Sequence, residues 1–411
     1  MKHLVKSLNK AVQLGYNKNI NLSNIPAECL EKANTHDNKC DQQIIDSLNL
    51  KDKKVSYQGR TKIASREEVL QKFKEKFSEK KIELVSYYNS ELDCLIDDPS
   101  LMVVPIDDRI FNRAHGVFES ITFSNFQFNT FQAHLERLQR SCEKVGIHLD
   151  MSIQQMQSIM IDVAQHTYQQ LSQQGRSLEE LLHLVVHLRI WVSSGRKDFG
   201  IYSVGKEPIF YCASFVNHEL ASNLHKISQG IKEFTVSHEY LQELETVKST
   251  AYLQNCVTAD FAKQRGGYQG IRLDEEGHIL EQAMANVAYI DKNTKEFVTS
   301  LPDRIVAGTT MKKVINNYVE PVLIKNKVIK GVVRKNYTLQ DILENGSEFM
   351  CFGGDKVIPI LSVNDEQIAD GQMGPICKNI QQWYKEQMKE GDLTEKPHDN
   401  IYVIPITLED K

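Results

Sequence analysis

The spacing of apolar and polar positions changes along the chain and predicts a polar extension followed by two domains. Residues 1 to 82 are rich in Lys, Asn and Gln and short of aromatic side chains, which predicts a helical or irregular extension. Its strongest helix signal is a capping-box pattern, Ser-Arg-Glu-Glu, at positions 65–68. Apolar residues then recur at helical spacing at Val69, Leu70, Phe73 and Phe77. We expect this helix to pack on the main body or on a partner protein.

The pattern from residue 83 to residue 200 predicts a small α+β domain. Runs of apolar and β-branched residues separated by turn signals predict strands over 83–90, 101–107, 116–132 and 181–194. Apolar residues every three or four positions predict amphipathic helices over 133–147 and 153–171. In the first of these helices Leu135, Leu138, Cys142 and Val145 share one face.

Residues 201 to 207 form the predicted connector, and residues 208 to 411 the predicted large, β-rich domain. Pro208 opens a strand-rich block, and a helix is expected from about 250 to 265. Thr338 and Gly346 have the residue types of an N-cap and a C-terminal stop for a short helix between them. A last helix is expected from 375 to 388. The chain as a whole therefore belongs to the predicted α+β class.

Composition and charge limit the classes of molecule that this protein is expected to bind. The 411 residues are 41% hydrophobic and 25% charged, which is typical of a globular protein. The formal net charge is −5 and no basic block occurs, so nucleic acid and anionic membranes are poor candidate partners. No apolar run approaches the roughly 18 residues that a membrane-spanning helix needs.

The spacing of the cysteines and the composition of the first 24 residues indicate the cellular compartment. Eight cysteines are scattered singly, without Cys-x-x-Cys spacing, which favours a reducing compartment and predicts neither a disulfide framework nor a metal site. The first 24 residues lack acidic side chains but also lack Arg, whereas mitochondrial presequences are usually Arg-rich. The prediction is a cytoplasmic protein, with a mitochondrial location left open.

Lys248 is the first of four candidate chemical features. It lies in Thr-Val-Lys-Ser-Thr-Ala-Tyr-Leu-Gln-Asn, at the expected start of a helix. Taken alone, a lysine is far more often a solvated surface charge. A lysine amine that is partly desolvated or close to other cations instead has a lowered pKa and can form Schiff bases.

The other three features would suit the remaining parts of one cofactor. Gly308-Thr309-Thr310 opens a helix, where free backbone N–H groups and two hydroxyls can bind a phosphate, although a plain N-cap is the simpler interpretation. Arg137 could supply a cation for that phosphate or could be a solvated helix charge. Glu281 ends a predicted strand, where it could pair with a ring nitrogen or be solvated. An amine, anion donors and an acid are together what pyridoxal phosphate requires.

The order and context of these features resemble the fold-type IV, or class IV, pyridoxal-phosphate aminotransferases. The resemblance extends from about Tyr88 to the C-terminus and is carried by VPIDDRIFNRAHGVFES, AHLERL, TVKSTAYLQN, EQAMAN, IVAGTT and DGQMGP. The motifs RAHGVFES and LRIWVSSG are most similar to the branch of D-amino-acid aminotransferases found in plants. The family implies a small α+β domain, a larger barrel-like domain, a cofactor in the cleft between them, and a homodimer.

The resemblance also implies roles for individual residues. Lys248 would bond to the cofactor aldehyde and act as the catalytic base, and Glu281 would face the pyridine nitrogen. Arg137, Thr309 and Thr310 would hold the phosphate. Three further positions match residues near the cofactor or substrate, namely Tyr252, Phe118 and, for the substrate carboxylate, Arg189.

The implied reaction moves an amino group from an amino acid, of D-amino-acid or branched-chain type, to a 2-keto acid. The same lysine would also serve an aminodeoxychorismate lyase, which eliminates pyruvate. The sequence departs from the family after Glu281, where Gln282 and Met284 replace small polar residues. The long extension leaves a third alternative open, a catalytically reduced member that serves as a structural or assembly component through residues 1–82.

Overall fold

The computed structural model describes residues 43, 46, 60–78, 82–196, 199, 207–218, 226–237, 242–390 and 402–404. Contacts divide the chain into two units, Met1–Ser65 and Arg66–Lys411. Helix α4 (Arg66–Ser78) begins where the capping-box pattern predicts it and belongs to the second unit, whereas the sequence had placed it in the extension. The presequence-like residues 1–24 and most of the predicted partner-binding extension fall outside the described residues.

Seven antiparallel strands form the first sheet, in the order β17-β4-β3-β5-β6-β1-β2. Their bounds are β1 (Ile82–Asn89), β2 (Cys94–Ile96), β3 (Gly116–Ser124), β4 (Gln127–Phe128), β5 (Val186–Ser193), β6 (Ile209–Asn217) and β17 (Tyr402–Val403). Because β6 and β17 complete this sheet, the predicted boundary at 201–207 does not coincide with the edge of the first domain's sheet.

Two predicted strands need correction. The run 101–107 forms no strand; the short helix η2 (Pro99–Leu101) opens it, with the Asp98 side chain as its N-cap. The run 181–194 begins with the end of helix α8 (Leu178–His183), which has a capping box from Ser177, and only its second part is β5. The local capping pattern at 177–180 therefore outweighs the apolar run that follows it.

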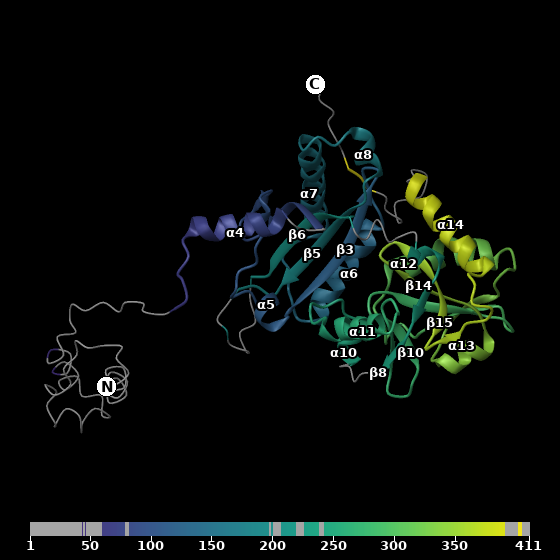
Figure 1. Ribbon diagram of the computed structural model, residues 1–411. Coiled ribbons are helices and arrows are strands. Elements are labelled where there is room, and N and C mark those ends of the chain that lie inside the picture. Colours follow the sequence, from purple (N-terminus) through teal and green to yellow (C-terminus); the bar gives the residue numbers. More distant parts are fainter. Residues whose placement is uncertain are drawn as a thin grey trace. The chain divides into compact units, whose positions relative to one another are not determined.

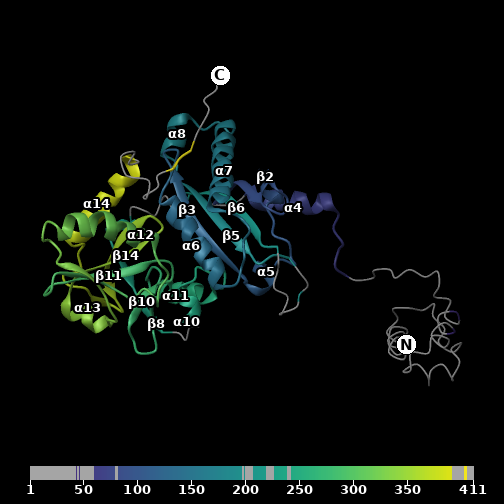
Figure 2. The ribbon, with the colours of Figure 1, turned by 180° about the vertical axis from the view of Figure 1, so that it is seen from behind.

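The first sheet has one face covered by helices and one face that carries polar side chains. Helices α6 (Phe131–Lys144) and α7 (Ile153–Gln173) pack against the sheet, with α8 beside them (Figures 1 and 2). Alternate residues such as Val117, Ile121 and Leu188 join the helices in one apolar core. The intervening residues face the other way and pair across β3 and β5 as Phe118 with Trp191, Ser120 with Arg189, and Thr122 with His187.

The remaining strands build the second part of the fold. One sheet has the order β13-β12-β11-β14-β15-β16, with β7 paired to β15, and a small sheet has the order β10-β9-β8. The bounds are β7 (Ile231–Glu233), β8 (Thr235–Ser237), β9 (Ile271–Leu273), β10 (Ile279–Gln282), β11 (Asn286–Asp291), β12 (Glu296–Thr299), β13 (Gly331–Arg334), β14 (Gly346–Gly353), β15 (Lys356–Val363) and β16 (Glu366–Gln367).

The helices of this part are α10 (Gln242–Glu245), α11 (Leu253–Gln264), α12 (Thr309–Val314), the π-helix η3 (Ile315–Ile324), α13 (Leu339–Asn345) and α14 (Pro375–Glu390); α5 (Arg109–Arg113) precedes β3. The prediction for α13 is confirmed, since Thr338 forms a capping box with Asp341 and Gly346 is the C-cap. Buried residues of α12, η3 and α14 pack on the larger sheet in one core.

Side chains join the two parts. Arg137 Nη1 donates to the Ala307 carbonyl at 2.8 Å, and Lys313 Nζ donates to Asn129 Oδ1 at 3.1 Å. The mixture of helices and sheets confirms the predicted α+β class. Among the helices that the structure describes, none is long and apolar enough to cross a membrane.

Candidate active site

Lys248 lies in an extended segment between α10 and α11, beside the start of β3. Its carbonyl accepts a hydrogen bond from the Phe118 N–H at 3.0 Å, and Ser249 forms a bridge with Val117. Thr250 then bonds through its hydroxyl to the Ala114 carbonyl at 2.8 Å. The segment is thus fixed to the first sheet by its main chain, and α11 starts only at Leu253, later than predicted.

Two aromatic rings flank the Lys248 amine. Its Nζ lies 4.6 Å from the centre of the Phe118 ring and 5.7 Å from the centre of the Tyr252 ring. The two rings meet edge to face at 5.0 Å between centroids, and the Tyr252 hydroxyl donates to the Ala283 carbonyl at 3.3 Å. The structure therefore brings together three residues that the sequence analysis named separately.

The electrostatic surroundings lower the proton affinity of the Lys248 amine. Lys248 is half-buried, and burial, followed by the cations Arg137 and Arg189, lowers the pKa of its amine to about 8, although Glu119 and Glu281 oppose the change. At pH 7 a pKa of about 8 leaves roughly one amine in ten unprotonated, against fewer than about one in a thousand for an ordinary lysine. The interpretation of Lys248 as an ordinary solvated surface charge is therefore wrong.

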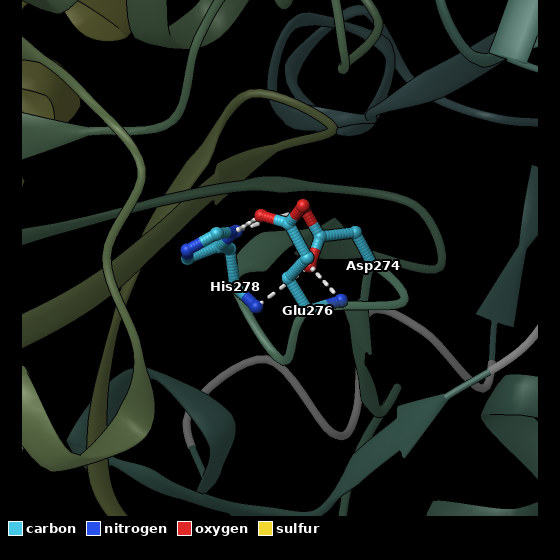
Figure 3. Close-up of side chains that lie close together, drawn as sticks. All are labelled: Asp274, Glu276 and His278. Atoms are coloured by element: carbon cyan, nitrogen blue, oxygen red, sulfur yellow. Dashed lines mark hydrogen bonds and ion pairs between the residues drawn. The ribbon is translucent and has the colours of Figure 1, made fainter.

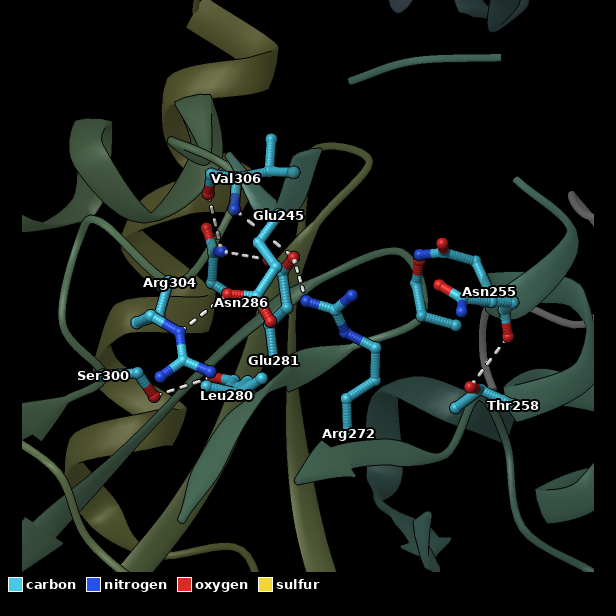
Figure 4. A network of polar contacts seen from close by, with 12 residues as sticks. Glu245, Asn255, Thr258, Arg272, Leu280, Glu281, Asn286, Ser300, Arg304 and Val306 are labelled. Carbon is cyan, nitrogen blue, oxygen red and sulfur yellow. Dashed lines mark hydrogen bonds and ion pairs between the residues drawn. The ribbon is translucent and has the colours of Figure 1, made fainter. Parts of the chain in front are cut away.

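Glu281 is buried on β10 and is held by three donors. Arg272 Nη2 donates to its Oε1 at 3.2 Å, the Val306 N–H donates to the same oxygen at 3.3 Å, and Asn286 Nδ2 donates to Oε2 at 2.8 Å (Figure 4). Burial raises the pKa of Glu281 to about 7 in spite of Arg272, the strongest opposing influence. A cavity of about 230 Å³ borders Glu281, Arg272 and Tyr252.

The Gly308-Thr309-Thr310 turn packs against the group around Glu281. A Cβ atom at Gly308 would lie 1.7 Å from Asn286 Oδ1, so only glycine fits there. That Oδ1 is buried and accepts no hydrogen bond from the residues that the structure describes. Thr310 is buried, and α12 begins at Thr309 as predicted, but it has six residues before the π-helix follows.

Arg137 is buried and forms a bidentate pair with a residue that the sequence analysis did not name. Its Nε and Nη2 donate to the two carboxylate oxygens of Glu119, each at 2.6 Å. Burial alone would raise the pKa of Glu119, but Arg137 and then His134 outweigh it and hold the pKa of this carboxyl well below its usual range. His134 lies between Glu119 Oε2, at 2.7 Å from its Nδ1, and the Thr309 hydroxyl, at 3.2 Å from its Nε2.

This network joins β3, α6 and the segment before α12. Because a carboxylate only accepts hydrogen bonds, His134 Nδ1 carries the proton toward Glu119. Together with the bond from Arg137 to Ala307, the His134–Thr309 contact fixes the predicted phosphate turn to helix α6. Glu119 and His134 therefore position Arg137 and Thr309.

Arg189 lies on the polar face of the first sheet, with its guanidinium carbon 5.1 Å from the centre of the Phe118 ring. Its Nε is buried and donates to no residue that the structure describes. Burial lowers the pKa of Arg189. A cation with an unused buried donor, one aromatic ring away from the Lys248 amine, suits an anionic group brought by a ligand.

A separate group of possible metal ligands lies in the turn between β9 and β10. Ligand atoms of Asp274, Glu276 and His278 lie within 4.8 Å of one another (Figure 3). Asp274 Oδ1 accepts the backbone N–H groups of Glu276 and His278 at 3.0 and 2.8 Å, and its Oδ2 lies 3.7 Å from Arg304 Nη1. These contacts close a tight turn, and that turn explains why the three side chains lie close together.

Sequence reasoning missed Glu119, His134 and Arg272. Glu119 carried a usable signal, because it occupies an apolar-facing position of β3 between Val117 and Ile121. His134 precedes Arg137 by three positions, so the two share one helix face. Arg272 gave no comparable signal, since its role depends on the pairing of β9 with β10.

Comparisons with known proteins support one family. Residues 116–363 match the family model described as "Amino-transferase class IV". The D-amino-acid transaminase, chloroplastic, of Arabidopsis thaliana is 29% identical over 315 residues, covering 75% of this chain and 78% of the relative. The branched-chain amino acid aminotransferase from Escherichia coli superposes with a TM-score of 0.63 at 19% identity, covering 78% of this chain and 99% of the other. Another branched-chain amino acid aminotransferase, solved with pyridoxamine 5′-phosphate, has a TM-score of 0.64 at 15% identity, covering 79% of this chain and 99% of the other.

Proposed function

The chain belongs to the class IV aminotransferases, which transfer amino groups, and we propose that it does so with pyridoxal 5′-phosphate held at Lys248. The observation that carries this proposal is the Lys248 amine, half-buried between Phe118 and Tyr252 with its pKa lowered to about 8. When bound, the cofactor supplies an aldehyde for the substrate amine and an electron sink for the charge that develops at Cα.

The residues present fit this cofactor by the chemistry of their donors. Lys248 offers an amine with an appreciable neutral fraction, and Glu281 a buried carboxyl that can accept a hydrogen bond from a ring nitrogen. Thr309 and Thr310 would bind the phosphate with their N–H groups, because the Thr309 hydroxyl already contacts His134 Nε2. Arg137 has five N–H groups, and those of Nη1 and Nη2 not bonded to Glu119 or Ala307 would reach the same phosphate.

Each of the remaining residues would bind substrate or move a proton. Lys248 Nζ, once released by the incoming amine, would take the proton from the substrate Cα, because an amine with a pKa near the working pH is an effective base. Arg189 would bind the substrate carboxylate, and Phe118 would pack against the reacting end of the substrate. Glu281 would keep the ring nitrogen protonated with help from Arg272 and Asn286.

We propose D-amino acids as the amino donors, since the Arabidopsis relative named for them aligns over three quarters of this chain. The branched-chain aminotransferases support the fold at less than 20% identity. The homodimer and the cytoplasmic compartment stay predictions from the sequence.

Reconstitution of the purified protein tests the proposal. Pyridoxal 5′-phosphate should give a violet absorbance band that is absent in Lys248→Ala, while circular dichroism shows that this variant is folded. D-alanine with 2-oxoglutarate should then yield pyruvate, and L-alanine and L-leucine serve as matched donors. A wild type that stays colourless with added cofactor contradicts the cofactor proposal. Turnover of the L-donors alone contradicts the proposed stereochemistry.

A further inference from the structure

A second cavity lies farther along the polar face of the first sheet. It has a volume of about 590 Å³, within the range of roughly 300 to 1,000 Å³ that is usual for small-molecule sites. Thr122 and His187, which pair across β3 and β5, form part of its wall. None of the residues assigned above to the cofactor or to the substrate lines it. His187 is two positions from Arg189 on one strand, about 7 Å along the sheet.

Most of the surface that the cavity wall exposes is apolar. The apolar side chains come from the loop before β5, from β6, from the segment before β7 and from β15, at Leu184, Val185, Val216, Ile227, Val357 and Ile358. Burial of an apolar ligand against such side chains is favourable by about 25 cal/mol per Å² removed from water. The site therefore suits a ligand with an apolar body.

One carboxylate at the cavity is already satisfied. Asp355 Oδ1 accepts a hydrogen bond from the Tyr384 hydroxyl at 3.0 Å, and its Oδ2 accepts one from the Thr122 hydroxyl. These bonds join the β14–β15 turn to α14 and to the first sheet. Asp355 is thus engaged in holding the cavity wall together.

Two amines line the cavity and form no ion pair with a residue that the structure describes, those of the exposed Lys385 and of Lys356. Lys356, the first residue of β15, is half-buried and forms no ion pair with any residue that the structure describes. Burial lowers the pKa of its amine, with only Asp355 opposing the change. His187, stacked on Phe215 at 5.3 Å, is neutral near pH 7, because burial, followed by Lys356 and Arg189, lowers its pKa to about 4.

We propose that this cavity is a second binding site, for a carboxylic acid with an apolar body, and that Lys356 is its anion-binding residue. The aliphatic wall would take the body of the acid, and the Lys356 amine its carboxylate, with the neutral His187 able to donate one hydrogen bond. A bound carboxylate would also relieve the cost of keeping a cationic amine partly buried. The acid is either a separate metabolite or the far end of a long substrate, since His187 in the cavity wall is two positions from Arg189 on β5.

Octanoate is a suitable probe, and octanol, which has the same apolar body without the charge, is its matched ligand control. Calorimetric titration of the full-length protein should show octanoate binding more tightly than octanol. Lys356→Met should weaken octanoate binding roughly 10- to 100-fold, the usual effect of removing a charged hydrogen-bonding partner, and should leave octanol binding unchanged. Lys356→Arg keeps the charge and should retain octanoate preference.

Lys378, exposed on α14, provides the matched control variant, and Lys378→Met should bind octanoate as the wild type does. Equal octanoate affinity in Lys356→Met and wild type, or no octanoate binding at all, overturns the proposal. Competition of octanoate with the amino-acid substrate identifies the cavity as a substrate side-chain pocket, and simultaneous binding identifies a separate ligand; both support the site. Because binding is read without turnover, the outcome is independent of whether the proposed transamination is observed.

Discussion

Replacing Lys248 by methionine should make the cofactor-free protein more stable, although it removes the proposed catalytic residue. Burial and neighbouring cations lower the pKa of the Lys248 amine from its usual 10.5 to about 8. Each tenfold change in proton affinity corresponds to about 1.4 kcal/mol, so at pH 7 the folded protein loses about 3 kcal/mol relative to the unfolded chain by keeping this amine charged. Methionine has a similar length and no charge, so Lys248→Met should recover most of that free energy.

The sign of the pH dependence follows from the same pKa values. The amine has a lower pKa in the folded protein than in the unfolded chain, so the unfolded chain binds more protons between about pH 8 and 10.5. The penalty is complete below pH 8 and disappears as the pH rises toward 10.5. The advantage of Lys248→Met over wild type should therefore be greatest near pH 7 and vanish near pH 11.

Urea unfolding of the cofactor-free proteins, followed by far-ultraviolet circular dichroism at several pH values, measures this effect. Lys378→Met removes an exposed lysine and should change the free energy of unfolding by less than about 0.5 kcal/mol. If Lys248→Met is neutral or destabilising at pH 7, the Lys248 amine is not desolvated in the way the structure describes.

Two further substitutions test the neighbouring groups. Glu119→Gln leaves the buried Arg137 without a carboxylate, so it should lower the free energy of unfolding by about 3 to 5 kcal/mol and weaken cofactor binding. Thermal unfolding measures the first effect, and titration of the violet absorbance measures the second. Unchanged cofactor affinity would show that Glu119 does not position Arg137. Gly308→Ala puts a methyl group 1.7 Å from Asn286 Oδ1 and should cost about 1 to 3 kcal/mol, whereas Gly331→Ala, which meets open space, should cost little. Equal unfolding temperatures for these two variants would contradict the close packing at Gly308.

What could be predicted from the sequence is what depends on short-range spacing. The start of α4 after Ser65, the apolar face of α6 and the Thr338 cap of α13 each depend on residues a few positions apart, and each is found in the structure. The pairing of β6 with β5 and β1 depends instead on which distant strands meet. Local pattern contains no information about that choice, so the predicted connector at 201–207 precedes β6, which is a strand of the first sheet.

The residues of the candidate site also differ in how far the sequence predicts their contacts, and Arg137 is an example. It lies between Leu135 and Leu138 in the sequence, and its side chain is buried. A buried guanidinium needs a partner to offset desolvation, and nothing within α6 supplies the carboxylate. The partner is Glu119, 18 positions earlier on β3. There a charged side chain faces the helices, at a position where the strand pattern predicts an apolar residue. Either residue alone would be an unpaired buried charge, and their pairing accounts for the burial of both. A charged residue at an apolar position is therefore best taken as evidence for a second one elsewhere in the chain.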